Sequence, residues 1–148
     1  MTKKQVLVMV VMAVAVGVTC VGCGQPQGTP SVLRASTSGD AAIASAFRDQ
    51  RSGVQVASEG VVTRVLTDDN DGGRHQRFIV RLASGQTVLI AHNIDIAPRL
   101  PSLRPGDSVA FSGEYEWNAE GGLIHWTHHD PGGQHAAGWL KFNGQTFQ

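Results

Sequence analysis

The chain has little cysteine and no excess of charge of either sign. Only two cysteines, Cys20 and Cys23, occur among its 148 residues, and 12 Lys and Arg balance 12 Asp and Glu. This balance argues against a dedicated polyanion-binding protein, which usually presents a basic face. The sequence also has no Ser nucleophile elbow, no Gly-rich phosphate loop and no dinucleotide-binding fingerprint. Several common enzyme classes are therefore excluded, and the length suits one small domain.

The two cysteines lie at the end of an N-terminal apolar segment. Lys3 and Lys4 precede an apolar run over residues 6–18, which is the pattern of a secretory signal. The closing string, CVGC, resembles the lipobox of bacterial lipoproteins, with Cys20 standing where leucine is usual. The resemblance implies cleavage immediately before Cys23 and a lipid on that residue. A retained transmembrane anchor is the alternative, since the segment continued to residue 22 has about 17 mostly apolar residues, at the lower edge for spanning a bilayer.

Lipidation of Cys23 would have two further consequences. The mature domain would carry no free thiol, so a disulfide, a cysteine nucleophile and a Cys-based zinc site are excluded. Gly24, rather than Asp, follows Cys23, which resembles the outer-membrane pattern of Gram-negative lipoproteins. We therefore expect a lipid-anchored protein of the bacterial cell envelope, in the outer membrane and facing the periplasm if the cell is Gram-negative.

The remaining chain divides where its composition changes. A stretch rich in Gly, Pro, Ser and Thr indicates a flexible tether. Asp40 then suits a helix N-cap, and Ile43 and Phe47 fall on one helical face. The apolar period afterwards changes to two, which predicts strands. The expected parts are a signal peptide (1–22), a lipidated cysteine with its tether (23–39), a short helix (40–53) and a β domain (54–148).

The β domain shows five main strand patterns separated by turn signals. The first three come close together, and Pro98 and Pro101 limit the connection after them to a helical turn or two. Three strands, a helical connection and two strands is the order of an OB-fold, a five-stranded, partly open barrel. Other small barrels and a sandwich are the alternatives. The expected strands cover residues 54–66, 77–82, 87–91, 108–117 and 123–128, followed by a small hairpin with an Asn143-Gly144 turn.

Three strings of this domain carry a family resemblance. They are TDDNDGGRHQRFIVRLASGQTVLIAHNIDIAPRL, GDSVAFSGEYEWN and GGLIHWTHHDP. Together they resemble an uncharacterised bacterial family, domain of unknown function 3465, over roughly residues 55–148. The resemblance implies an OB-type domain behind a signal or anchor. It brings no substrate and no catalytic residue, so candidate sites have to be derived from the chemistry of the residues.

A candidate metal site follows from the alternation of the last two strands. If the aromatic residues face the barrel interior, Glu114 and Glu116 face outward, as do His125 and His129 on the next strand. A register that places Glu116 opposite His125 would bring a carboxylate and an imidazole together. Such a group suits a divalent metal ion or an acid–base pair. Alternatively, these histidines bond backbone groups, with Trp side chains filling the barrel mouth. The candidate metal ligands are His125, His129, Glu114 and Glu116.

A second set of candidates lies near the Asp-rich turn over residues 67–73. An EF-hand is rejected there because Phe78 stands where the bidentate Glu is required. His75 and Arg77 are candidate anion ligands, and His92 leaves the third strand close to the same loops. Tyr115 is a candidate stacking residue. A hairpin turn and structural roles in the barrel are the alternatives for these residues.

These patterns support two main functional hypotheses. The first is a lipid-anchored envelope protein whose barrel binds a protein or a small molecule, without catalysis. The alternative is a metal-dependent hydrolase, such as a nuclease, in which Glu116 acts as a base and Arg77 stabilises phosphate charge. A divalent metal is the only cofactor that either hypothesis implies. A third hypothesis is a purely structural envelope protein. Nucleic acid is disfavoured as a partner, because without Lys3 and Lys4 the 12 acidic residues outnumber the 10 basic ones.

Overall fold

The computed structural model describes residues 31–148, with side chains from residue 38 onward. The signal peptide, Cys23 and the first part of the tether lie outside the described residues, so those expectations remain predictions. Across the described part, no helix combines the length and the apolar character needed to cross a bilayer. The elements in chain order are α1 (Ser31–Arg48), β1 (Val54–Val65), β2 (His75–Leu82), β3 (Thr87–Asn93), β4 (Ser108–Glu116), β5 (Leu123–His125), β6 (Trp139–Phe142) and β7 (Gln145–Phe147).

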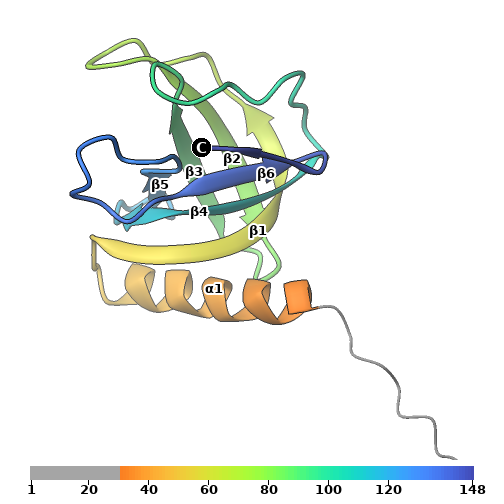
Figure 1. Cartoon of the computed structure of the whole chain (residues 1–148). Coiled ribbons are helices and arrows are strands. Elements are labelled where there is room, and N and C mark those ends of the chain that lie inside the picture. Colours follow the sequence, from red (N-terminus) through yellow and green to blue (C-terminus); the bar gives the residue numbers. More distant parts are fainter. Residues whose placement is uncertain (1–30) are drawn as a thin grey trace, which may run out of the picture.

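Five of the strands close into a barrel, as the strand order predicts. Neighbours follow the order β1, β2, β3, β5 and β4, and β4 returns to pair with β1 over Val54 to Val61. The β3–β5 pair is parallel, whereas every other pair in the barrel is antiparallel. Figure 1 shows α1 running along the outside of β1, at the base of the barrel. The OB-like fold is thus confirmed.

Alternation along the strands fills the barrel with apolar side chains. On β2 and β3, alternate residues are buried, and the intervening ones face outward. Burial of a large apolar side chain contributes about 1.5–3 kcal/mol, so this interior dominates the stability. Ile43 of α1 is completely buried, which shows that the helix closes one side of the core. The largest fully buried side chains include Tyr115, Phe78, Phe111, Ile90 and Leu140.

The helix differs from the sequence-based expectation in its length and its start. It begins at Ser31, inside the expected tether, and ends at Arg48. Asp40 is therefore not an N-cap but a buried residue in the middle of α1. Its carboxylate accepts hydrogen bonds from the Ser58 hydroxyl on β1 and from the Ser84 backbone N–H, 3.1 Å away. The polar side chain that suggested a helix start instead ties α1 to the barrel.

The connection between β3 and β4 contains turns but no helix, so the expected short helix there is wrong. Pro98, Pro101 and Pro105 each lack a backbone donor and restrict the preceding residue. Side chains of the barrel hold this segment in place of helical hydrogen bonds. Gln76 donates to the Leu100 carbonyl and accepts from the Leu100 N–H.

The C-terminal part of the chain shows one confirmation and one difference. The hairpin of β6 and β7 forms as predicted, with Asn143 and Gly144 at φ values of 50° and 77°. By contrast, the fifth strand is only three residues long. It ends because Trp126 adopts φ of 50°, a left-handed conformation that a non-Gly residue rarely adopts. The chain then forms the loop 126–138 before β6 pairs with β4.

Candidate functional site

The outward face of β4 and β5 brings together two carboxylates and two imidazoles. Glu114 and Glu116 alternate with the buried Tyr115 on β4, so both project outward. His125 projects from β5, and His135 reaches the same place from the loop 126–138. We call these four residues the carboxylate–histidine cluster. His125 Nε2 lies 3.7 Å from a Glu114 oxygen and 3.6 Å from a Glu116 oxygen, while His135 Nδ1 lies 3.5 Å from the second Glu114 oxygen.

The strand register that produces this convergence differs from the expected one. Glu114, not Glu116, lies opposite His125, and Glu116 lies opposite Leu123. Glu116 reaches His125 on the diagonal, which is within range of long side chains on one sheet face. Gly113 permits the close pairing, because a Cβ there would lie 2.3 Å from the His125 carbonyl oxygen. Three of the four predicted metal ligands are therefore close together despite the register difference.

His125 occupies an electrostatically mixed position. Burial lowers the pKa of its imidazole below the usual value, although the Glu114 and Glu116 carboxylates act to raise it. The neutral form is therefore favoured near pH 7. Its Nε2 atom is shielded from solvent and has no hydrogen-bond partner among the described residues. A neutral imidazole nitrogen facing two carboxylates is a chemically unsatisfied arrangement.

The loop 126–138 explains how His135 joins the cluster, which the sequence-based analysis missed. The Asp130 carboxylate accepts backbone N–H groups from Gly132, Gln134 and His135 at 2.7–2.9 Å. The His135 and Gly132 N–H groups hold the pKa of the Asp130 carboxyl below its usual value. This turn folds the chain back, so that the His135 ring stacks on Trp126 at 3.7 Å. The D-P-G-G string was a turn signal, but the stacking partner could not be identified from the turn alone.

The remaining histidines of this region do not join the cluster. His129 is exposed and lies outside the group of ligand atoms, so its predicted place on the outward face of a fifth strand is wrong. The left-handed Trp126 breaks the alternation on which that prediction depended. His128 is buried, and its Nδ1–H donates to the His129 carbonyl at 2.9 Å.

His92 is a core residue and not an accessible ligand. Its side chain is completely buried. Nε2 lies 3.1 Å from the Pro98 carbonyl, which can only accept, so Nε2 carries the proton. Nδ1 then accepts from the Thr127 hydroxyl at 2.9 Å. Burial lowers the pKa of His92 from 6.5 to about 4, so the ring is neutral at physiological pH.

Tyr115 is also part of the interior. Its ring is completely buried, and its hydroxyl donates to the Gly121 carbonyl at 3.3 Å. Gly122 lies against this ring, since a Cβ there would be 2.1 Å from a Tyr115 ring carbon. Burial raises the pKa of the Tyr115 phenol above its ordinary value. The side chain has no exposed face on which a base could stack.

His75 and Arg77 lie on the outward side of β2, apart from the cluster. The Arg77 guanidinium contacts Asp69 at 3.4 Å and donates to the Thr67 carbonyl at 3.2 Å. His75 Nδ1–H donates to the Gly73 carbonyl at 3.0 Å. His75 also lines a small cavity of about 130 Å³, together with Ile96, His125 and His128. The structure therefore brings His75 toward the His125 side of the barrel, whereas Arg77 is used by the Asp-rich turn.

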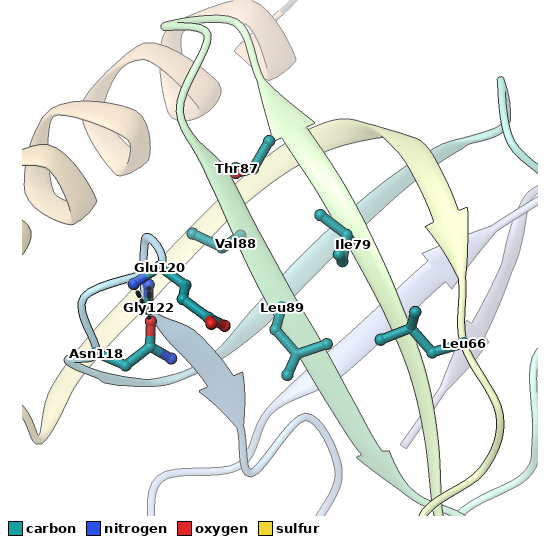
Figure 2. A pocket seen from close by; sticks show the side chains of 8 residues that line it. All are labelled: Leu66, Ile79, Thr87, Val88, Leu89, Asn118, Glu120 and Gly122. Carbon is teal, nitrogen blue, oxygen red and sulfur yellow. Dashed lines mark hydrogen bonds between the residues drawn. The ribbon is translucent and has the colours of Figure 1, made fainter.

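A separate cleft lies on the outside of the barrel, between β3 and the loop that connects β4 to β5 (Figure 2). Leu66, Ile79 and Leu89 provide apolar side chains, and Asn118 and Glu120 of the loop form the polar rim. The cleft measures about 120 Å³. None of its residues was a sequence-based candidate, because outward-facing Leu and Ile on an alternating strand resemble ordinary half-buried positions.

One comparison with known proteins identifies the family. The family model described as "Protein of unknown function (DUF3465)" matches residues 30–148, which is most of the chain. The chain belongs to this family, and the match includes α1 as well as the barrel. No curated protein matches the chain. The family description assigns no activity.

Proposed function

We propose that this member of the family is a lipid-anchored cell-envelope protein whose barrel binds a partner polypeptide in the cleft beside β3. The observation that supports the proposal is the position of the cleft. The outward face of strands 2 and 3, together with the loops beside it, is where OB-folds take up extended ligands. Here that face combines an apolar floor with a polar rim.

The size of the cleft favours a partner protein over a small molecule. Small-molecule sites usually measure about 300–1,000 Å³, whereas this cleft measures about 120 Å³. It suits one apolar side chain on Leu66, Ile79 and Leu89. An anchor of this kind is typical of a protein interface, where a few buried side chains supply most of the affinity.

Asn118 and Glu120 on the rim of the cleft determine which polar groups of a partner can lie beside its apolar side chain. The Asn118 side-chain oxygen Oδ1 accepts the backbone N–H groups of Glu120 and Gly122 at 2.9 and 3.0 Å. This fixes the Asn118 side chain and leaves its amide N–H groups to donate to a partner. The Glu120 carboxylate favours a donor or a cation. A carboxylate at this position also disfavours a phosphate backbone, so a peptide segment fits better than a nucleic acid.

Site-specific photocrosslinking tests the binding site. A photoreactive amino acid in place of Leu89 should give one discrete protein adduct in envelope preparations, and Glu120→Lys should abolish it. The matched control replaces Thr146, which is exposed on β7. The same adducts from both positions, or none from Leu89, would contradict binding in the cleft.

Membrane attachment is tested separately through Cys23. We expect labelled palmitate to be incorporated into the wild type but not into Cys23→Ser. The Cys23→Ser protein should also leave the membrane fraction after processing. Retention of an unprocessed Cys23→Ser chain in the membrane would instead support an uncleaved N-terminal anchor.

A metal-dependent hydrolase is the second candidate, favoured by the convergence of Glu114, Glu116 and His125. Arg77 does not complete such a site. It lies opposite Ala91 of β3, two strands from His125, a separation of about 10 Å. Zinc- or manganese-dependent cleavage of a phosphodiester, lost in Glu116→Gln, would favour catalysis over binding alone.

A further inference from the structure

We propose that Glu114, Glu116 and His125 bind a transition-metal ion of the zinc type on the outward face of β4 and β5. Each residue supplies one ligand atom, and the three atoms lie within 4.8 Å of one another. Three protein ligands would leave a fourth coordination position for water or a ligand group. This site is independent of the cleft beside β3, which is lined by other residues.

The spacing of the ligand atoms fits such an ion. Zinc binds imidazole nitrogen and carboxylate oxygen at about 2.0–2.2 Å, so neighbouring ligand atoms of a tetrahedral site lie about 3.3 Å apart. In the protein, His125 Nε2 lies 3.7 Å from the Glu114 oxygen and 3.6 Å from the Glu116 oxygen. Shifts of a few tenths of an ångström would therefore bring His125 Nε2 and each of these oxygens to the spacing of neighbouring metal ligands, and the two carboxylate oxygens lie within 4.8 Å of each other.

The same distances argue against an ion pair as the role of the cluster. A hydrogen bond between a protonated imidazole and a carboxylate is about 2.7–2.9 Å long. Both His125 contacts are longer by more than half an ångström. His125 Nε2 has no hydrogen-bond partner in the part of the chain that the structure describes. Within residues 38–148, only histidines come within ion-pairing distance of Glu114 and Glu116, so no Lys or Arg neutralises the two carboxylates.

The surrounding loop supports the ligands from outside. His135 Nδ1 lies 3.5 Å from the second Glu114 oxygen, and a shift of about half an ångström would let it hydrogen-bond and orient that carboxylate. Stacking on Trp126 and the Asp130 turn hold the His135 ring in place. Such outer partners orient ligands and raise metal affinity. The strained conformation of Trp126 places the stacking surface there, which is consistent with a functional constraint.

The donor set selects the kind of ion. One imidazole and two carboxylates suit zinc, manganese or iron(II), whereas calcium requires six to eight oxygen ligands and magnesium retains most of its water. We therefore expect zinc to bind in the presence of a large excess of calcium or magnesium. Cobalt(II) should occupy the same position and give a visible absorption spectrum.

The experiment measures binding of zinc chloride to the full chain, purified in detergent and stripped of metal. Isothermal titration and metal analysis should show one zinc per chain. His125→Ala and Glu116→Gln should each weaken binding by about 100-fold or more. His135→Ala should weaken it by about 10-fold, the range expected of an outer partner.

His129→Ala is the matched control, because His129 is an exposed histidine four residues from His125. It should bind zinc like the wild type. Glu116→Gln keeps the shape of the side chain, so its thermal unfolding without metal should match the wild type and exclude misfolding. Absence of stoichiometric zinc on the wild type, or equal binding by wild type, His125→Ala and Glu116→Gln, would overturn the proposal.

Discussion

His92 is a fully buried imidazole and His125 a half-buried one, and their polar surroundings differ. His92 lies inside the barrel with both ring nitrogens hydrogen bonded to neutral groups, at 2.9 and 3.1 Å. His125 lies on the outward face beside two carboxylates, and its Nε2 has no hydrogen-bond partner among residues 38–148. The first arrangement stabilises the fold by satisfying every polar atom. The second leaves binding capacity unused, which is the pattern of a site.

Replacement of His92 should have the largest effect on stability. In His92→Leu, the Thr127 hydroxyl and the Pro98 carbonyl would lose their partners inside the protein, each at a cost of about 1–3 kcal/mol. We expect the free energy of unfolding to fall by about 4 kcal/mol, measured by urea denaturation at pH 7. A loss below about 1 kcal/mol would show that water replaces the ring and that the contrast with His125 is smaller.

Acid should reproduce part of that effect without a mutation. The pKa of His92 is lowered from 6.5 to about 4, so the unfolded chain binds a proton between these values and the folded one does not. The free energy of unfolding is therefore unaffected by His92 titration above pH 6.5. It decreases as the pH falls toward 4, by about 3 kcal/mol in total. Urea denaturation from pH 7 to 4 measures it, and His92→Gln should flatten the slope.

Asp40 extends the comparison to a buried carboxylate. Like the ring of His92, the Asp40 carboxylate has its hydrogen-bond partners inside the protein, Ser58 and Ser84, and these bonds connect α1 to the barrel. Asp40→Ala should lower the free energy of unfolding by about 2 kcal/mol, because hydrogen bonds to a charged group contribute about 1.5–3 kcal/mol. Hydrogen exchange should show α1 opening before the barrel, and unchanged exchange in α1 would mean that apolar contacts alone hold it.

Replacement of a carboxylate in the carboxylate–histidine cluster should not lower the stability, in contrast to replacement of His92 or Asp40. Glu116→Gln removes one of two neighbouring negative charges that no Lys or Arg neutralises within the described residues. In metal-free protein we expect stability to remain equal or to rise by up to about 0.5 kcal/mol, as is common where a site is maintained for function. Thermal unfolding with a chelator checks this, and a clear loss of stability would place Glu116 among the structural residues.

Much of the fold could be predicted from the sequence because the strand pattern is regular. Alternating apolar residues on β2 and β3 and the Asn143-Gly144 turn each have one local interpretation. The start of α1 could not be predicted, because Asp40 suits both an N-cap and a buried contact with Ser58, which lies 18 residues away. The connection after β3 depended on prolines that stop a helix but do not specify the turns that replace it.

The candidate site was predicted only in part, because strand alternation predicts side-chain direction only within regular strands. Alternation identified Glu114, Glu116 and His125, since these positions belong to regular strands. It then assigned His129 wrongly, because one left-handed residue, Trp126, ended the strand. His135 depends on a stacking contact across nine residues, for which the sequence carries no periodic signal. The cleft beside β3 depends on the β4–β5 loop, whose position follows from tertiary packing.

The loop 126–138 begins and ends beside the same strand. Trp126 follows β5 and Gly138 precedes β6, and both of these strands pair with one edge of β4. A Cβ on Gly138 would lie 1.9 Å from the Trp126 carbonyl oxygen, so the two ends of the loop touch. Lengthening a loop whose ends are already joined costs little, about 0.6 kcal/mol for each doubling. The exposed residues 131–134 and 136–137 of this segment are therefore a place where evolution or an engineer can insert or exchange residues beside the cluster, whereas Thr127 and His128 are buried.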